Sequence, residues 1–339
     1  MAILNPFESS NAFNMASMTR AVNILPNMYD RLGRMGVFRT RGIPTRSVIV
    51  EEYEGQLSLL PTTAVGAPGS LNERGTRTLR SFAVPFMALD ESIAPEQYQG
   101  IRSFGTENRM ETLTEIMNDR LQQMRNKFDI TKEYMRMAAL KGTLVDCYAN
   151  TIYNYFTEFG VSQKTVDFDL DNATLVEVQE KCFEVSRHVE DYLQGESYTR
   201  LHCLCDSTFF DALITHDHVK EVFQGWARAE QVLGGDPRKG FTFAGITFEE
   251  YRGTASDPAG SARAFVDAGS GYVFPVGTMN VFEEIYAPAD FLETANTNGL
   301  SLYAKQETRK FGRGVDIHMQ SSPLMLNKRP NLVVKVTKT

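Results

Sequence analysis

The sequence has 339 residues, of which 42% are hydrophobic and 23% are charged, a composition that is typical of a folded protein and excludes a largely disordered one. This length is enough for one elaborate domain or two coupled domains. A net charge of −7 argues against a dedicated nucleic-acid-binding domain, which would carry an excess of basic residues. No run of about 18 apolar residues and no basic-then-apolar N-terminal segment occurs, so we expect neither a membrane span nor a signal peptide.

The charge is unevenly distributed along the chain. Residues 1–48 contain six Arg against two acidic residues, and residues 301–339 contain eight basic against two acidic residues. Between them, residues 143–200 contain eleven acidic against four basic residues. Such polarity suits head-to-tail contacts between copies of the chain, although solvated surfaces explain most runs of charge.

The first part of the chain predicts an arm and then a hairpin. Residues 1–40 have scattered apolar positions without a sustained period, which indicates an arm laid over another part of the structure. Two strand-like runs at 47–60 and 77–86 flank a segment at 61–76 that is rich in Thr, Gly, Ala, Pro and Ser. A lone two-stranded hairpin buries too little apolar surface to be stable in water. We therefore expect a neighbouring subunit to support it, and a hairpin within an ordinary sheet is the alternative.

One long amphipathic helix is predicted at 106–141, with Thr106 as its N-cap and Gly142 as its stop. At 1.5 Å per residue it would be roughly 54 Å long, whereas a compact chain of this length has a radius of gyration of only about 20 Å. Its apolar positions recur every three or four residues, as expected of one buried face. They are Met110, Leu113, Met117, Leu121, Met124 and Phe128.

The rest of the chain alternates between strand and helix patterns. A hairpin is predicted at 143–159, followed by an amphipathic helix at 173–193 that Asp171 or Asn172 would cap. A strand at 201–205 leads into helices at 207–214 and 216–226. The remaining strand candidates are 241–252, 264–267, 271–275, 301–309, 316–321 and 332–336. The whole pattern predicts an α+β protein.

Two clusters invite a chemical interpretation, and neither supports it well. The acidic run 167–172 lacks the Gly and the bidentate Glu of a calcium loop. The spacing of His202, Cys203, Cys205, His216 and His218 fits no common zinc pattern, and buried thiols in a core strand are the simpler interpretation. With Cys147 and Cys182 these cysteines lack the spacing of a disulfide framework. No phosphate loop, nucleophile elbow or dinucleotide fingerprint occurs. We predict a protein that is not an enzyme and has no catalytic, cofactor or metal site, with a small Cys/His metalloenzyme as a remote alternative.

Several segments resemble one family in order and spacing. They are Met319-Gln-Ser-Ser-Pro-Leu-Met-Leu326 with Leu332-Val-Val-Lys-Val336 at the end, Met137-Ala-Ala-Leu-Lys-Gly142 after the long helix, Leu204-Cys-Asp-Ser-Thr-Phe-Phe210, Val276-Gly277, and Tyr286-Ala-Pro-Ala-Asp290. Together they resemble the lambda-like major capsid protein E family of tailed phages, over nearly the whole chain from about residue 20.

This resemblance implies an α+β fold of the Hong Kong 97 type. The N-terminal arm would be residues 1–40 and the extended E-loop residues 41–86. A peripheral domain would follow at 87–159, with the spine helix at 106–141. The axial domain would be residues 160–300, and residues 301–339 would return to the peripheral domain.

The resemblance also implies a function. The chain would be a major capsid protein of a tailed phage that self-assembles as hexamers and pentamers into the icosahedral shell around the genome. It would be found in the virion, and in the host cytoplasm during assembly. Its partners would be copies of itself, scaffold, portal and a decoration protein as in lambda-like relatives, with nonspecific contact to packaged DNA and no membrane. No cofactor is implied. An encapsulin-type cellular compartment is the closest alternative.

Two groups of arginines are candidates for contacts. Those of the E-loop are candidates for charge-assisted contacts with a neighbouring copy, or alternatively keep an exposed hairpin soluble; they are Arg74, Arg77 and Arg80. Those near the N-terminus either face the lumen, where scaffold or DNA phosphates lie, or pair with acidic residues of the same or a neighbouring chain; they are Arg20, Arg31, Arg34, Arg39 and Arg41.

The E-loop carries no lysine, because the first lysine of the chain is Lys127. Some relatives join neighbouring subunits through an isopeptide bond from an E-loop lysine. We therefore predict a shell that is held together without covalent bonds.

Overall fold

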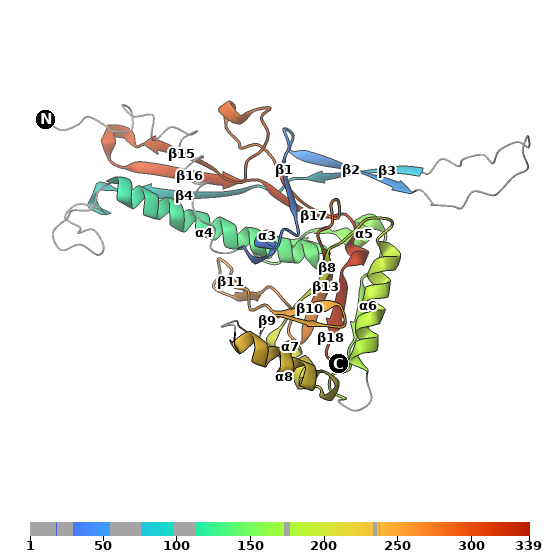
Figure 1. The fold of residues 1–339 in the computed structure, drawn as a ribbon. Coiled ribbons are helices and arrows are strands. Elements are labelled where there is room, and N and C mark those ends of the chain that lie inside the picture. The colour runs from blue at the N-terminus through green and yellow to red at the C-terminus, as the bar shows by residue number, and fades with distance from the viewer. Residues whose placement is uncertain are drawn as a thin grey trace, which may run out of the picture.

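The computed structural model describes residues 18, 30–54, 76–97, 113–172, 177–232, 236 and 238–339. Two three-stranded sheets lie along the long helix α4 (Leu113–Leu140), and a six-stranded sheet with its helices lies on the other side of it (Figure 1). A two-stranded hairpin projects away from this body. The mixture of helices with mostly antiparallel strands confirms the predicted α+β class.

The described helices differ widely in length, because α4 alone has 28 residues. The others are α3 (Arg31–Arg34), α5 (Tyr155–Phe159), α6 (Val178–Tyr192), α7 (Ser207–Thr215) and α8 (Asp217–Val232). Short 3-10 turns occur at Pro95–Gln97, Leu292–Thr294, Lys310–Gly312 and Pro330–Leu332.

The described strands form three larger sheets and three two-stranded ones. One three-stranded sheet has the order β1 (Arg39–Gly42), β14 (Phe282–Tyr286), β17 (Pro323–Asn327), and the other has the order β15 (Tyr303–Thr308), β16 (Val315–Ser321), β4 (Met87–Ile93). The six-stranded sheet has the order β7 (Lys164–Asp167), β18 (Val334–Thr337), β13 (Ser270–Val276), β8 (Arg200–Cys205), β10 (Ile246–Glu250), β9 (Lys239–Phe243). The pairs are β2 (Ser47–Glu54) with β3 (Thr76–Ala83), β5 (Thr143–Val145) with β6 (Thr151–Asn154), and β11 (Thr254–Ser256) with β12 (Ala262–Ala264).

The long helix is confirmed over the part that the structure describes, while residues 106–112, with Thr106 and Met110, lie outside it. Its apolar stripe is buried against the β15–β16–β4 sheet, where it meets Ile317 and Met319. The helix ends at Leu140, and Gly142 follows with φ +90°. A Cβ at Gly142 would clash with the Phe156 ring, so glycine is required both for the turn and for the packing.

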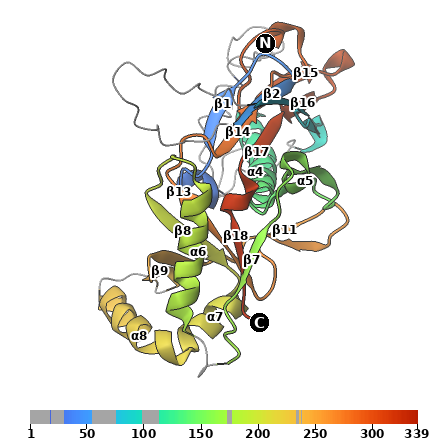
Figure 2. The same cartoon turned by 90° about the vertical axis from the view of Figure 1, so that its right-hand side faces the viewer.

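The six-stranded sheet forms the core of the lower half of the molecule. Every residue of β13 and five of the six residues of β8 are buried, so both faces of these central strands are covered. Helices α6 and α7 contact this sheet (Figure 2). The apolar side of α6 consists of Val178, Cys182, Val185 and Val189, as the sequence predicts.

Some elements differ from those predicted. Helix α6 begins at Val178 with Glu177 at its N-cap, so the prediction that Asp171 or Asn172 caps it is wrong. Six strands are not predicted, because their residues show no clear alternation or lie next to polar, Pro- or Gly-rich segments; they are β1, β4, β7, β11, β14 and β17. The last strand, β18, pairs with β7 and β13 in the six-stranded sheet, whereas β14 pairs with β1 and β17 beside α4.

Candidate subunit-interaction surfaces

The β2–β3 hairpin is anchored through one face at its base. Val48 and Val50 are buried, and Phe82, which lies opposite Val48, is only 1% exposed. The Phe82 ring packs edge-on against Tyr153, with ring centroids 5.2 Å apart, and also contacts Tyr155. The Tyr153 hydroxyl accepts a hydrogen bond from the amide of Ala83 and donates one to its carbonyl. The base of the hairpin is therefore fixed, while the outer ends of β2 and β3 extend beyond the body (Figure 1).

The opposite face of the hairpin carries two exposed apolar side chains. Ile49 and Leu79 are 64% and 65% exposed, and the register places Ile49 opposite Ser81 and Leu79 opposite Glu51. Since alternate residues of a strand share a face, these four side chains lie on one face. Exposed branched side chains on a projecting hairpin make this face a candidate interaction surface.

The structure describes the three candidate arginines of the E-loop to different extents. Arg74 lies outside the described residues. Arg77 is paired with Tyr53 through the backbone, and its side chain lies outside the described part. The guanidinium carbon of Arg80 lies 5.4 Å from the centre of the Phe159 ring, on the face that packs on its own chain. Their role in contacts between subunits stays a prediction.

Two of the five candidate arginines near the N-terminus lie close to carboxylates. Arg31 donates through Nε to Oε1 of Glu249 at 2.7 Å, and Arg41 donates through Nη2 to Glu283 at 3.1 Å. Arg34 is exposed in α3, and Arg39 is exposed in the edge strand β1. Arg20 lies outside the described residues. The predicted lumen-facing role stays untested, while pairing within the chain occurs for the first two.

A buried ionic network is centred on Arg136 near the end of α4. The Arg136 Nη2 lies 2.9 Å from each carboxylate oxygen of Glu284 on β14. The same guanidinium pairs with Glu133 at 3.2 Å and with Asp30. Glu133 in turn accepts a hydrogen bond of 2.8 Å from the amide of Leu32. The last part of the predicted arm is thereby bonded to the spine helix.

The same segment also reaches the six-stranded sheet. Glu249 on β10 accepts from Arg31 and lies 3.1 Å from Nε2 of His202 on β8. Burial acts to raise the pKa of Glu249, but the hydrogen bonds from His202 and Arg31 outweigh it and lower the pKa to about 2. Burial raises the pKa of Glu133 and lowers that of Lys132. Consecutive residues, from Asp30 to Leu32, therefore connect the two halves of the molecule.

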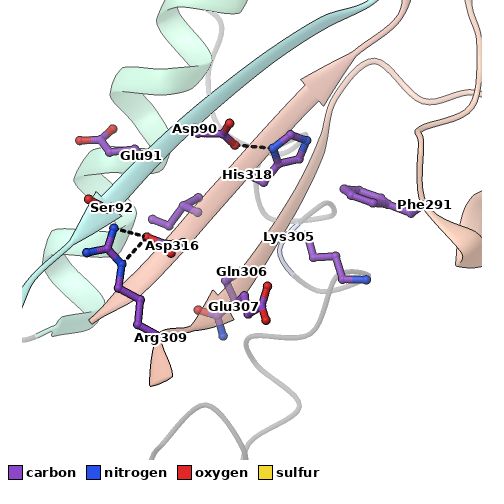
Figure 3. A pocket seen from close by; sticks show the side chains of 11 residues that line it. Asp90, Glu91, Ser92, Phe291, Lys305, Gln306, Glu307, Arg309, Asp316 and His318 are labelled. Carbon is purple, nitrogen blue, oxygen red and sulfur yellow. Dashed lines mark hydrogen bonds and ion pairs between the residues drawn. The ribbon is translucent and has the colours of Figure 1, made fainter. Parts of the chain in front are cut away.

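A hollow of about 710 Å³ lies on the face of the β15–β16–β4 sheet that is turned away from α4 (Figure 3). Lys305, His318 and Asp90 are register partners across its three strands. His318 pairs with Asp90 and meets the edge of the Phe291 ring, with ring centres 5.8 Å apart. Arg309 pairs with Asp316 at 2.8 Å. Glu307 also lines the hollow and is exposed.

The Cys/His cluster has the surroundings of a structural core. Cys182, Cys203 and Cys205 are buried, and all four cysteines are free thiols. Burial raises the pKa of Cys182 to about 12, which keeps it protonated. His202 is bonded to Glu249, whereas His216 stacks on His218 between α7 and α8. Among the described residues no group of three or more His, Cys, Asp or Glu is arranged to hold a metal ion. None of the helices in the described ranges is long and apolar enough to cross a membrane.

Comparison with known proteins explains this combination of a projecting hairpin, a long helix and two halves. The model of the family described as phage major capsid protein E matches residues 14–338. The chain belongs to the phage major capsid protein E family. Its relatives include the major capsid proteins of Salmonella phage Felix O1 and Pseudomonas phage KPP10, each 30% identical to this chain. Both alignments cover 96% of this chain, and they cover 96% and 97% of the two relatives.

The fold of this capsid protein is shared with solved structures of low sequence identity. A prophage protein of E. coli CFT073, assigned as a capsid protein, is 10% identical with a TM-score of 0.58, over 97% of this chain and all of that one. The Hong Kong 97-type fold expected from the sequence is therefore confirmed. As a major capsid protein, the chain is a repeated subunit of an icosahedral phage shell and a component of the virion.

Sequence reasoning misses some residues of the candidate surfaces and of the buried ionic network in this capsid protein. Ile49 and Leu79 look like ordinary strand residues in the sequence, because their exposure depends on whether another part of the chain packs on their face of the hairpin. The buried network carries a weak sequence signal, since Asp129, Lys132, Glu133 and Arg136 recur at helical spacing. Glu284, which pairs with Arg136, lies 148 residues further along the chain, and only the fold brings Arg136 and Glu284 together.

Proposed function

We propose that this capsid protein assembles as hexamers and pentamers into its shell, and that the β2–β3 hairpin of each copy lies on a neighbouring copy. The family and its relatives support self-assembly as the basic function. The arrangement around the hairpin supports the finer statement. The hairpin has a fixed base, and its other face carries two branched apolar side chains that are about two-thirds exposed.

The contact is proposed to be mainly apolar. Burying Ile49 and Leu79 would each contribute about 1.5–3 kcal/mol of transfer free energy before the cost of association. One such contact is weak, but every copy in a closed shell makes it both as donor and as acceptor. Arg74 and Arg77 are proposed to add charge-assisted bonds at the rim. Arg80 is proposed to contribute less, because its guanidinium covers Phe159 of its own chain.

The domain assignment is proposed as follows. Residues 1–40 form the arm and 41–86 the E-loop. The peripheral domain consists of α4 with the β1–β14–β17 and β15–β16–β4 sheets, and the axial domain consists of the six-stranded sheet with α6, α7 and α8. This division follows the sheets, so that β14 is peripheral and β18 is axial.

Further partners are proposed from the family role. Scaffold and portal proteins would direct assembly in the host cytoplasm, and a decoration protein would bind the finished shell. Basic residues of the arm, among them Arg20, Arg34 and Arg39, would meet scaffold or packaged DNA through nonspecific charge attraction. No catalytic role is proposed, in keeping with membership of a structural family.

The test is assembly of the purified full-length chain, followed by negative-stain microscopy and sedimentation. We expect the unmodified protein to form closed shells. Leu79→Glu should lower the yield of shells by about tenfold or more, because a charge would be buried at the contact. The matched control is Thr78→Glu, which adds the same charge on the opposite face of the hairpin. Equal yields from Leu79→Glu and the unmodified protein would disprove the hairpin contact, and a chain that never forms shells would disprove self-assembly.

A further inference from the structure

The hairpin tip between β15 and β16 exposes a strained aromatic residue. Phe311 is 90% exposed and has φ +64°, a backbone conformation that bulky residues rarely adopt. Gly312 and Gly314, which follow closely, also have positive φ. The Arg313 guanidinium lies 5.6 Å from the centre of the Phe311 ring. A large apolar side chain held outward at such a turn indicates a contact with another molecule.

The tip also carries uncompensated positive charge. Arg309 is paired with Asp316, but Lys310 and Arg313 have no carboxylate within ion-pair distance in the part of the chain that the structure describes. Both side chains are exposed. The tip therefore presents two free cations on either side of an aromatic ring, and a partner surface should be acidic with an apolar or aromatic patch.

The hollow of Figure 3 has the complementary character. Asp90 is 79% exposed at its side chain and pairs with His318, which is charged only when protonated. Glu307 has no ion pair among the described residues, whereas Lys305 is held by Glu293 at 3.0 Å. Phe291 forms one edge of the hollow. The hollow thus offers the Glu307 carboxylate, which has no ion pair among the described residues, and the exposed Asp90 carboxylate beside His318. Both lie near the half-buried Phe291 ring, over which the Lys305 ammonium lies 5.1 Å from the ring centre.

We propose that the 309–314 tip of one copy inserts into this hollow on a second copy. Phe311 would pack against Phe291, and Lys310 and Arg313 would pair with Asp90 and Glu307. A single copy cannot make this contact, because the tip continues the same two strands that floor the hollow and points beyond their last register pair, Thr308 with Val315. Every copy carries both halves of the contact, so it can repeat around a symmetry axis of the shell. The contact requires the self-assembly proposed above and adds a second interface to it.

Disulfide trapping tests the contact directly. Two variants, Phe311→Cys and Phe291→Cys, which replace the two rings proposed to meet, are prepared in a Cys147→Ser background, because Cys147 is the one native thiol that is not fully buried. The two are assembled together, oxidised, and run on a non-reducing denaturing gel. We expect a dimer band in the mixture that reductant removes and that neither variant forms alone. Absence of the band from assembled shells would overturn the proposal, as would an equal band from Phe311→Cys alone, which would place two tips against each other.

Charge reversal gives an independent test. Lys310→Glu with Arg313→Glu should lower shell yield by about tenfold, and adding Asp90→Lys with Glu307→Lys should restore it. The matched control reverses two exposed charges elsewhere, Lys239→Glu with Arg252→Glu, and should leave the yield unchanged. Shells that form equally well with the reversed tip would overturn this contact. Failure of the unmodified chain to form shells would instead count against the proposed function, so the two failures are distinguishable.

Discussion

Arg136 and Glu284 form a bidentate ion pair that joins the spine helix to strand β14, with both N–O distances from Nη2 at 2.9 Å. Both side chains are buried, at 6% and 2% exposure. Burial acts to lower the pKa of Arg136, but the nearby Glu284 carboxylate outweighs it and raises the pKa, so the arginine stays charged. The pair therefore fixes the position of the helix relative to the sheet, and its loss would leave a buried charge without a partner.

Replacing Arg136 should be strongly destabilising. Arg136→Met leaves Glu284 and Glu133 buried without their cation, and we expect the free energy of unfolding to fall by about 3–5 kcal/mol. Equilibrium urea unfolding of the unassembled subunit measures this. Arg252→Met is the control, since Arg252 is 75% exposed and should change stability by less than about 1 kcal/mol. A double variant with Glu284→Gln should be less destabilised than the sum of the single changes, and additive effects would contradict a direct pair.

Stability should depend on pH through Glu249. Its pKa in the folded state, about 2, is below the ordinary value of 4.5. A lowered pKa means that the carboxylate stabilises the fold above pH 4.5, and that this contribution is lost as pH falls from about 4.5 towards 2. The shift corresponds to about 3 kcal/mol. Urea unfolding at a series of pH values between 7 and 3 measures the loss.

Glu249→Gln is the variant that separates this effect from other carboxylates. Glu133 contributes with the opposite sign, because its raised pKa favours the folded state as pH falls. We expect Glu249→Gln to be less stable than the unmodified chain at pH 7, with a smaller decline towards acid. Parallel pH profiles for the two proteins would show that Glu249 is not responsible.

The base of the hairpin should depend on Phe82. Phe82→Ala removes a buried ring from contact with Tyr153, Tyr155 and Phe159, and we expect a loss of about 3–5 kcal/mol. Leu79→Ala, on the exposed face of the same strand, should change the stability of the free subunit by no more than about 0.5 kcal/mol. Urea unfolding and amide exchange across β2 and β3 provide the measurement. Similar effects of both substitutions would mean that the two faces are not distinct.

The shell should dissociate completely into single chains under denaturing conditions. No lysine precedes Lys127, so the hairpin has no side-chain amine for an isopeptide bond. Assembled particles heated in denaturant with reductant should give one band at 38.1 kDa on a gel. A ladder of bands resistant to reductant would reveal covalent bonds between subunits and refute this prediction.

The sequence by itself determines the elements with strong local patterns. The apolar stripe of α4 at Met117, Leu121, Met124 and Phe128 predicts the long helix and its buried face, because helical spacing is a local property. The buried strand β8 and the helices α6 and α7 are recognised for the same reason. The order of short motifs along the chain also identifies the family, because each motif is a continuous stretch of residues.

The tertiary structure alone decides which residues meet. Glu284 is an unremarkable acidic residue in the sequence until β14 places it beside Arg136, and Glu249 likewise meets Arg31 across 218 residues. Exposure of Ile49, Leu79 and Phe311 also depends on the fold, because a strand residue is exposed or buried according to what packs on its face. Contacts between distant residues are set by the global packing, which local patterns do not specify, and the proposed surfaces of this capsid protein consist of such contacts.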